Sequence, residues 1–207
     1  MNDDPTGGAG AAEGPPAKRV RADAQRSMDA LLAAAAEVFA TSGVDAPVRQ
    51  ITAKAGVGAG TFYRHFPQRA DLIAAVFRRE VDACADAAPD LAAQYEPAEA
   101  LAKWLQRFTV FIAAKRGLSA ALHSGDPTYE TLPAYFDQRF MPALGMLLDA
   151  AAKAGRIRSD VDAEDLLLAT RNLTLPAEED PTGHTQRMIA LLVDGLRYGS
   201  TGGNRGE

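Results

Sequence analysis

The sequence is poor in the residues that carry several common kinds of chemistry. Among its 207 residues there is one cysteine, Cys84, and one tryptophan. A single cysteine excludes an internal disulfide and a metal site built from several thiolates. The three histidines lie far apart in the sequence, at 65, 123 and 184, without the spacing typical of metal ligands or a catalytic triad. We therefore expect no metal and no other cofactor.

Two kinds of segment are also missing. The sequence contains no apolar run long enough to cross a bilayer, and no basic and then apolar segment of the signal-peptide type at its start. Together with the lack of paired cysteines, this predicts a cytoplasmic protein without a membrane partner.

Helix-forming residues, alanine above all, dominate the composition. Hydrophobic residues make up 47% of the chain, whereas aromatic residues make up only 7%. Such a composition suits packed helices better than a sheet, in which β-branched and aromatic residues prevail. It predicts an all-α fold. The length allows one compact unit, or one small and one medium-sized domain.

Charge is distributed unevenly along the chain. The formal net charge is −5, yet residues 17–80 hold ten Lys or Arg against six Asp or Glu, whereas residues 81–207 hold twelve against eighteen. A basic first part joined to an acidic body favours a polyanionic partner for the first part alone.

Composition divides the chain into four parts. Residues 1–16 are rich in Gly, Ala, Pro and Asp and offer little to bury, so we expect a disordered tail there and another at 199–207. Between them we expect a small helical domain at 17–67 and a larger one at 68–198. The small domain begins with a basic arm that contains Lys18, Arg19 and Arg21.

The small domain has the outline of a helix-turn-helix. Apolar residues recur at helical spacing from Ala22 to Ser42. A second helix is predicted at Val48–Ala55 and ends at Gly56, a residue suited to the left-handed conformation that closes helices. A third is predicted at Ala59–Phe66, because Pro67 cannot continue it. Two short helices joined by a glycine turn form this motif.

The glycines before the third helix do not form a phosphate loop, because a helix rather than a strand precedes them and no Lys-Ser/Thr pair follows. Phe62 and Phe66 lie four residues apart and are expected to face the core. The free N–H groups at Ala59 and Gly60 offer a place for a phosphate. The outward positions carry groups that contact phosphates and base edges in DNA: Thr61, Tyr63, Arg64 and His65.

The segment QITAKAGVGAGTFYRHFPQRADLIAAVF, Gln50–Phe77, resembles the DNA-binding signature of TetR-type transcriptional repressors. The resemblance implies that Thr61, Tyr63 and His65 contact DNA. It also implies that three residues near the start of the second helix lie beside a phosphate: Arg49, Gln50 and Thr52. This sequence departs from the family where Ser-Lys commonly opens the third helix, since Gly58-Ala59 removes a helix cap and a cation. The basic arm is expected to replace part of the positive charge that is missing at this position.

Simpler interpretations exist for several of these residues. Tyr63 is also consistent with a tyrosine that covers the edge of the core. Four arginines are consistent with ordinary solvated helix charges: Arg64, Arg69, Arg78 and Arg79. We assign Arg78 and Arg79 to solvent. We assign Thr61, Tyr63 and His65 to DNA, because an exposed set of this kind has no packing role.

The rest of the chain is predicted to form further helices at Pro97–Lys115, Arg116–Ser124, Pro127–Ala154, Asp162–Leu175 and Thr185–Tyr198. Pro133 and Pro142 predict breaks or kinks in the third of these. Large side chains in these helices are the candidate lining of an effector pocket: Trp104, Phe108, Phe111, His123, Tyr129, Tyr135, Phe136, Phe140 and Met141.

A homodimer is expected for two reasons. One short recognition helix reads too few base pairs, whereas two copies about one helical turn apart match a palindrome. In the resembling family, the last two helices pair across a two-fold axis. The candidate interface consists of apolar stripes on these two helices: Leu166, Leu167, Thr170, Leu173, Ile189, Leu192, Val193 and Leu196. A core within one chain explains these stripes equally well.

These observations predict an effector-responsive DNA-binding regulator, a repressor released from a palindromic operator on double-stranded DNA by a small apolar or aromatic molecule. The helix after Pro67, Gln68–Ala87, is expected to carry the signal. One alternative is a helical protein-interaction module that has lost DNA binding, as Gly58-Ala59 suggests. The other is an all-α enzyme, but Ser124-Gly125-Asp126 beside His123 is as readily a turn. We therefore expect no enzyme.

Overall fold

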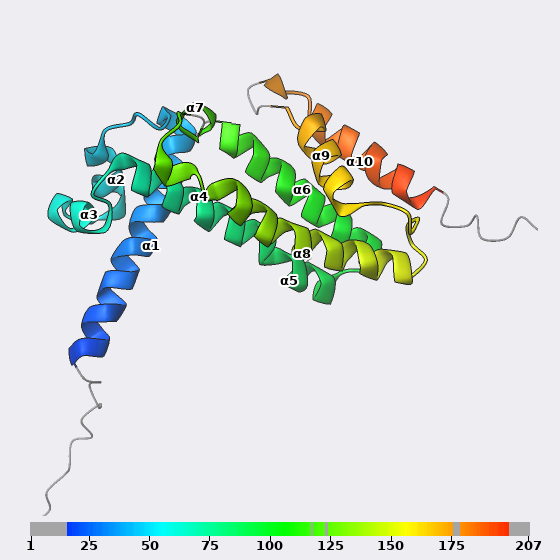
Figure 1. Ribbon diagram of the computed structural model, residues 1–207, viewed down its shortest axis with the longest axis horizontal. Coiled ribbons are helices and arrows are strands. Elements are labelled where there is room, and N and C mark those ends of the chain that lie inside the picture. Colours follow the sequence, from blue (N-terminus) through cyan, green and yellow to red (C-terminus); the bar gives the residue numbers. More distant parts are fainter. Residues whose placement is uncertain (1–15, 117, 123, 176–178, 199–207) are drawn as a thin grey trace, which may run out of the picture.

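A computed structural model describes residues 16–116, 118–122, 124–175 and 179–198. Within these ranges the chain forms ten α-helices and one 3₁₀ helix and contains no strand, which confirms the predicted all-α fold. Figure 1 shows a small group of helices at one end and an elongated bundle at the other, with α4 leading from the first into the second.

The small group contains α1 (Pro16–Ser42), α2 (Val48–Ala55) and α3 (Ala59–His65). Gly56 closes α2 with a φ of 65°, in the left-handed region that glycine adopts without strain, and its N–H donates to carbonyls of the last turn. Phe66 caps α3 immediately before Pro67. The predicted helix-turn-helix is therefore present.

The first helix begins earlier than the sequence pattern predicted. It starts at Pro16 instead of Ala22, so the expected basic arm is a helical extension of α1 and not a separate strand of chain. Proline is well suited to the first helical position, where its missing N–H has no partner to lose. The expected tails at 1–15 and 199–207 lie outside the described residues.

Helix α4 (Arg69–Ala85) is joined to the small group by arginines that the sequence analysis treated as solvated. Arg69 donates to the carbonyl of Val44 and, over 2.9 Å, to that of Ala46. Arg79 donates to the carbonyl of Asp29 in α1 over 2.8 Å. Assigning Arg79 to solvent was therefore wrong, because its guanidinium is bonded to the backbone of α1. Arg69, for which a solvated charge was one interpretation, is bonded to the loop before α2.

The body consists of α5 (Ala87–Gln94), α6 (Pro97–Arg116), α7 (Ser119–Leu122), a 3₁₀ helix η1 (Pro127–Tyr129), α8 (Leu132–Lys153), α9 (Ala163–Leu173) and α10 (His184–Arg197). Helix α5 was not predicted. Asp162 caps α9 by accepting from the N–H groups of Glu164 and Asp165 over 2.8 and 3.1 Å.

Neither proline breaks α8. The helix begins at Leu132, so Pro133 occupies its first turn, where no intrahelical hydrogen bond is lost. Pro142 lies inside the helix, which nevertheless continues to Lys153. Pro142 is exposed, so the carbonyl that it leaves without a donor can meet water.

The body is built around aromatic rings. Trp104 and Phe108 of α6 stack with ring centroids 5.7 Å apart, and Phe140 of α8 stands edge-on to both. The indole N–H of Trp104 donates to the carbonyl of Cys84 in α4 over 3.0 Å, which satisfies the one polar atom of this fully buried ring. None of the described helices has the length and apolar character needed to span a membrane.

Candidate nucleic-acid interface and effector cavities

Helix α3 has one buried face and one exposed face. Phe62 and Phe66 are 1% and 3% exposed and belong to the hydrophobic core that includes Ile51 of α2. Tyr63, the residue next to Phe62, is 56% exposed. Arg64 is exposed as well, whereas Thr61 and His65 are half-buried. The hydrophobic side anchors the helix and leaves a phenol and a guanidinium available on its outer side.

The start of α2, the first helix of the motif, carries the other predicted contact residues. Arg49 and Gln50 are exposed there. Thr52, which was predicted to lie near a phosphate, is only 9% exposed, and its hydroxyl donates to the carbonyl of Arg49 over 3.2 Å. The structure therefore removes Thr52 from the candidate interface, because its hydroxyl already has a partner inside the helix.

The first turn of α3 presents almost no side chain. Gly58 is the cap residue and makes no side-chain cap, as the sequence predicted, and Ala59 and Gly60 are exposed. A Cβ added to Gly58 or Gly60 would meet nothing within 4 Å. Packing within the chain therefore does not require these glycines, and the open surface leaves room for another backbone to approach.

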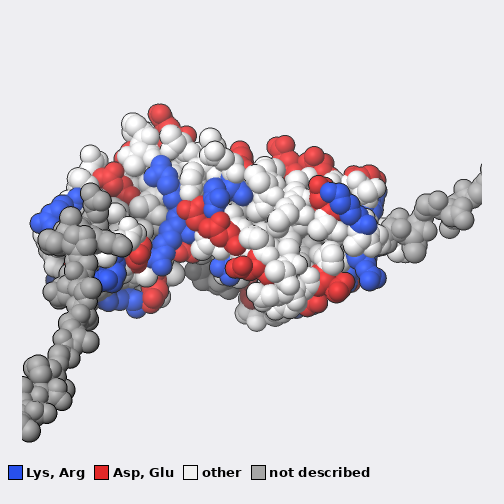
Figure 2. Space-filling model, turned by 90° about the horizontal axis from the view of Figure 1, so that it is seen from below, with Lys and Arg blue, Asp and Glu red and all other residues white. Residues whose placement is uncertain are grey.

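Charge on this end of the molecule is mixed. Figure 2 shows basic side chains around the end that carries α2 and α3, with acidic side chains among them, and both kinds of charge also on the face of the body seen there. Lys18, Arg19 and Arg21 continue α1 beyond this end, and their side chains lie outside the described part of the structure.

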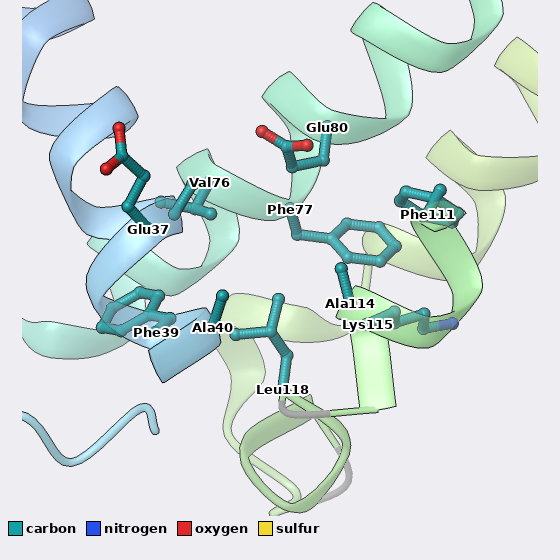
Figure 3. A pocket seen from close by; sticks show the side chains of 11 residues that line it. Glu37, Phe39, Ala40, Val76, Phe77, Glu80, Phe111, Ala114, Lys115 and Leu118 are labelled. Carbon is teal, nitrogen blue, oxygen red and sulfur yellow. The ribbon is translucent and has the colours of Figure 1, made fainter. Parts of the chain in front are cut away.

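Two neighbouring cavities are found in the described part of the chain, one between the small group and the body and one within the body. The first, here called the α1 cavity, has a volume of about 250 Å³ and is enclosed by α1, α4 and α6 (Figure 3). Its lining is mainly apolar and includes Phe39, Val76 and Phe111. The second, here called the α9 cavity, has a volume of about 360 Å³ and is lined by residues of α4, α6, α7, η1, α8 and α9, among them Tyr129 and Arg171.

The predicted pocket residues separate into three groups. Phe111 lines the α1 cavity, and Tyr129 and Phe136 line the α9 cavity. The others were placed wrongly or are not described. Trp104, Phe108 and Phe140 are fully buried core residues, Met141 packs against that core, Tyr135 bonds to α4, and His123 lies outside the described residues.

Lys115 was not predicted from the sequence, yet it lines both cavities, as Phe77 does. Lys115 continues the apolar stripe of α6, at helical spacing after Leu101, Trp104, Phe108 and Phe111. A lysine in register with such a stripe is the signal that could have indicated it. Burial, and secondarily the charge of Arg171, lowers the pKa of Lys115 from its ordinary value.

A polar cluster links α4 to α8 beside these cavities. The hydroxyl of Tyr135 donates to Asp82 over 2.6 Å, and Arg139 donates to the same carboxylate over 2.7 Å and also to Asp86. Arg78 donates to the hydroxyl of Thr131 over 3.0 Å. Arg78 is therefore a second arginine, after Arg79, that was wrongly assigned to solvent.

The candidate dimer residues lie mainly inside the chain. Six of them are buried in the hydrophobic core: Leu166, Leu167, Thr170, Ile189, Val193 and Leu196. Leu173 and Leu192 are partly buried and pack against it. The intrachain explanation is therefore correct for this stripe, because the bundle needs an apolar face from each helix. Leu168 and Leu191 instead point outward and are 44% and 63% exposed.

The structure supports neither a reactive thiol at Cys84 nor a metal site among the described residues. Burial raises the pKa of the Cys84 thiol to about 12, with Glu80 adding to the effect, so the thiol stays protonated at neutral pH. Asp82 and Asp86, which the sequence places near it, do not account for the shift. Across the described ranges, no three His, Cys, Asp or Glu residues form a group that could hold a metal ion.

Comparison with known proteins identifies the family. A family model of bacterial regulatory proteins of the tetR family matches residues 31–76, and one of the C-terminal domain of SbtR-like transcriptional regulators matches residues 96–198. A TetR transcriptional regulator from Streptomyces coelicolor is 40% identical, with a TM-score of 0.71 over 82% of this chain and 97% of that chain. The chain belongs to the TetR family.

Other solved structures agree with this assignment. A TetR transcription regulatory protein from Mycobacterium vanbaalenii is 34% identical, with a TM-score of 0.69 over 86% of this chain and 99% of that chain. A gamma-butyrolactone receptor shares the fold at 22% identity, with a TM-score of 0.58 over 85% and 90% of the two chains. A comparison with curated proteins finds no match.

Membership in the TetR family confirms the resemblance found in the sequence. The protein is a transcription regulator with a DNA-binding helix-turn-helix in α2 and α3, and the match to the C-terminal domain model covers α6 to α10. A regulator fold of this kind points away from the all-α enzyme that the sequence left open.

Proposed function

We propose that this TetR-family protein is a repressor that binds a palindromic operator as a homodimer and leaves it when a small apolar or aromatic effector binds. The observation that carries the proposal is the division of α3 between buried Phe62 and Phe66 and exposed Tyr63 and Arg64. A short helix anchored in this way can enter a major groove with its outer side chains toward base edges and phosphates.

The proposed DNA-binding unit comprises residues 17–67, and the effector-binding and dimerisation unit comprises residues 68–198. The extension of α1 is proposed to lie near the DNA backbone and to supply basic groups in place of the cation missing at Gly58-Ala59. The proposed contact residues are Arg49, Gln50, Ala59, Gly60, Thr61, Tyr63, Arg64 and His65, together with Lys18, Arg19 and Arg21.

The proposed dimer face is the outer side of α9 and α10. Leu191 of α10 and Tyr198, directly after the end of α10, are 63% and 88% exposed, and Leu168 is exposed on α9. Large apolar side chains are costly to leave in water, so a row of them supports pairing with a second copy. This face replaces the buried stripe predicted from the sequence.

The α1 cavity supports a route from effector to DNA. Its walls come from α1, which belongs to the DNA-binding unit, and from α4 and α6, so an occupant would contact both units. Arg69 of α4 bonds to the loop before α2, and a 2.6 Å ion pair between Lys54 and Glu37 joins α2 to α1. Moving α1 against α6 would therefore carry α3 with it.

The effect of such a movement is a change in the separation of the two α3 helices of the dimer. A coupling of about 1–3 kcal/mol between effector and operator, roughly 5- to 150-fold in affinity, is enough to change occupancy. The shared fold of the gamma-butyrolactone receptor is consistent with a small ligand in a bundle of this shape.

The test is selection of a duplex from genomic fragments, followed by titration of the enriched duplex by fluorescence anisotropy. We expect the affinity to fall steeply as salt rises, because phosphate contacts release counterions. Tyr63→Ala should weaken binding by about tenfold or more, since it removes a hydrogen-bonding group from the protein surface that contacts DNA. Tyr95→Ala, at the exposed end of α5, is the matched control and should bind like the parent.

The alternative of a protein-interaction module gives a different result. It predicts no enriched duplex and negligible affinity even at low salt. Equal binding by the parent and Tyr63→Ala would refute the placement of α3 in the groove while leaving DNA binding itself intact.

A further inference from the structure

Lys115 is held in an apolar setting without an acidic partner. Its ammonium group lies 5.3 Å from the ring centroids of both Phe77 and Phe136. The side chain is half-buried, and in the described part of the chain no carboxylate lies within ion-pair distance of it. Lys103, the other lysine of α6, does have an acidic partner: it pairs with Glu99 at 3.4 Å and also lies over the ring of Tyr95.

A second cation faces the same space. Arg171 of α9 lines the α9 cavity together with Lys115, and its charge is one of the two causes that lower the pKa of Lys115. Arg171 is exposed and Lys115 is half-buried. Two positive groups that face one cavity repel each other, and an anion between them would relieve that repulsion. The fold does not need these charges for packing, since a leucine or methionine would fill the stripe of α6 equally well.

We propose that the α1 cavity and the α9 cavity form one effector site for a small amphipathic carboxylate, with its anionic head between Lys115 and Arg171 and its apolar body toward α1. The inference rests on the proposed function, because it names the chemical class of the effector that would release the operator. Aromatic walls from Phe77 and Phe111 suit a hydrocarbon body.

The size of the cavities supports a ligand that extends through both. Their volumes of about 250 and 360 Å³ each lie near the lower end of the roughly 300–1,000 Å³ typical of ligand pockets. They share Phe77 and Lys115 as a common wall, so the head and the body of one molecule would lie on either side of the same two residues.

Three carboxylates line these cavities and could favour a cationic ligand instead. Glu37 is already paired with Lys54 at 2.6 Å. In Figure 3 the carboxylate of Glu80 and the ammonium of Lys115 point in different directions, so Glu80 does not neutralise the lysine. Asp137 is exposed, where water screens its charge. Glu80 is half-buried like Lys115, but Glu80 lines the α1 cavity alone, whereas Lys115 also lines the α9 cavity, where the anionic head would lie.

The experiment measures binding by isothermal titration calorimetry with the full chain and no DNA. The probes share one hydrocarbon body and differ in the head group: decanoate, decanol and decylamine, with 2-naphthoate as a flat carboxylate. We expect a carboxylate to bind the parent about tenfold or more tightly than decanol, as a charge-assisted hydrogen bond would provide.

Variants separate the charge from the packing. Lys115→Met keeps the apolar stem and should weaken carboxylate binding by about tenfold or more while leaving decanol binding unchanged. Lys115→Arg should restore most of the affinity, and Arg171→Gln should weaken carboxylate binding as well. Lys103→Met, on the same helix but outside both cavities, is the matched control and should bind every probe like the parent.

Several results would overturn the inference. They are no carboxylate binding to the parent, equal binding of decanoate and decanol, tightest binding of decylamine, or no loss in Lys115→Met. Because these measurements contain no duplex, their failure leaves the operator-binding results untouched. Conversely, a carboxylate that binds through Lys115 but does not release the enriched duplex contradicts the proposed function and not the site.

Discussion

At the scale of single residues, Phe62 and Tyr63 divide anchoring from recognition within one turn of α3. The two rings stand edge-on, with centroids 5.2 Å apart and an interplanar angle of 89°. Phe62 is inside the core, whereas Tyr63 is mostly exposed. Adjacent helical residues point about 100° apart, so one residue can hold the helix in place while the next meets a partner.

Phe62→Ala should lower the free energy of unfolding by about 3–5 kcal/mol, because it removes a fully buried ring and leaves a cavity. Chemical denaturation followed by circular dichroism measures this, since helicity reports on the unfolding of an all-α chain. Tyr63→Ala is the comparison and should change stability by less than about 1 kcal/mol. A Phe62→Ala variant that unfolds like the parent would show that the helix faces the other way.

Because of Cys84, the free energy of unfolding should depend on pH in the alkaline range. The pKa of Cys84 is raised by burial from 9.0 to about 12, so the folded chain keeps the thiol protonated where the unfolded chain ionises it. That contribution is complete below pH 9 and is lost as the pH rises toward 12. The free energy of unfolding should therefore fall more steeply above pH 9 in the parent than in Cys84→Ala. Parallel curves for the two proteins would contradict the raised pKa.

At the scale of elements, the turn between α2 and α3 sets the angle at which the recognition helix leaves the core. Gly56 makes this turn in the left-handed region, and its N–H satisfies carbonyls at the end of α2. Helix α4 then follows at once, with a capping box between Gln68 and Asp71 at its start. The short connections leave α3 little freedom to move independently of its neighbours.

Gly56→Ala should destabilise the protein by about 1–2 kcal/mol, the cost of a left-handed conformation for a residue with a Cβ. Space is not the reason, because an added Cβ would meet nothing within 4 Å. Gly60→Ala is the matched control, since Gly60 lies within α3 with equal space around it and should gain up to about 1 kcal/mol in helix propensity. Thermal unfolding distinguishes the two, and a shift in the same direction for both would argue against the turn.

At the scale of the whole molecule, the C-terminal helices have two different sides. Their inner side, with Leu166 and Ile189, completes the core of the body. Their outer side carries Leu191 and Tyr198, which are exposed among the residues that the structure describes. Figure 1 shows α9 and α10 along the bundle, away from the small group of helices.

Leu191→Glu should convert a dimer to a monomer, because a carboxylate would be buried without a partner in the proposed interface. Light scattering coupled to gel filtration measures the mass. Affinity for a palindromic duplex should fall in the same variant, whereas its helicity should not change. Met146→Glu places the same charge on an exposed apolar position of α8 and should remain a dimer. A Leu191→Glu protein that stays dimeric would place the interface elsewhere.

Local patterns were enough to predict most helices and the helix-turn-helix. The pair Phe62 and Phe66, the glycine at 56 and the proline at 67 act on their own neighbours, so their effects depend on little else. Pro142 does not break α8, because its exposed position lets water reach the carbonyl left without a donor, and exposure is not a local property. Thr52 was misjudged because its hydroxyl could bond within the helix as easily as outside it.

The sequence by itself determined that this chain is helical, that a glycine turn joins two short helices, and that Tyr63 and Arg64 follow an anchoring phenylalanine. Those features come from spacing along the chain. Only the tertiary structure decided which apolar stripes face inward, that Lys115 lies between two phenylalanine rings, and that the cavities touch α1. Each of these depends on residues distant in sequence, whose side chains meet only once the helices have packed.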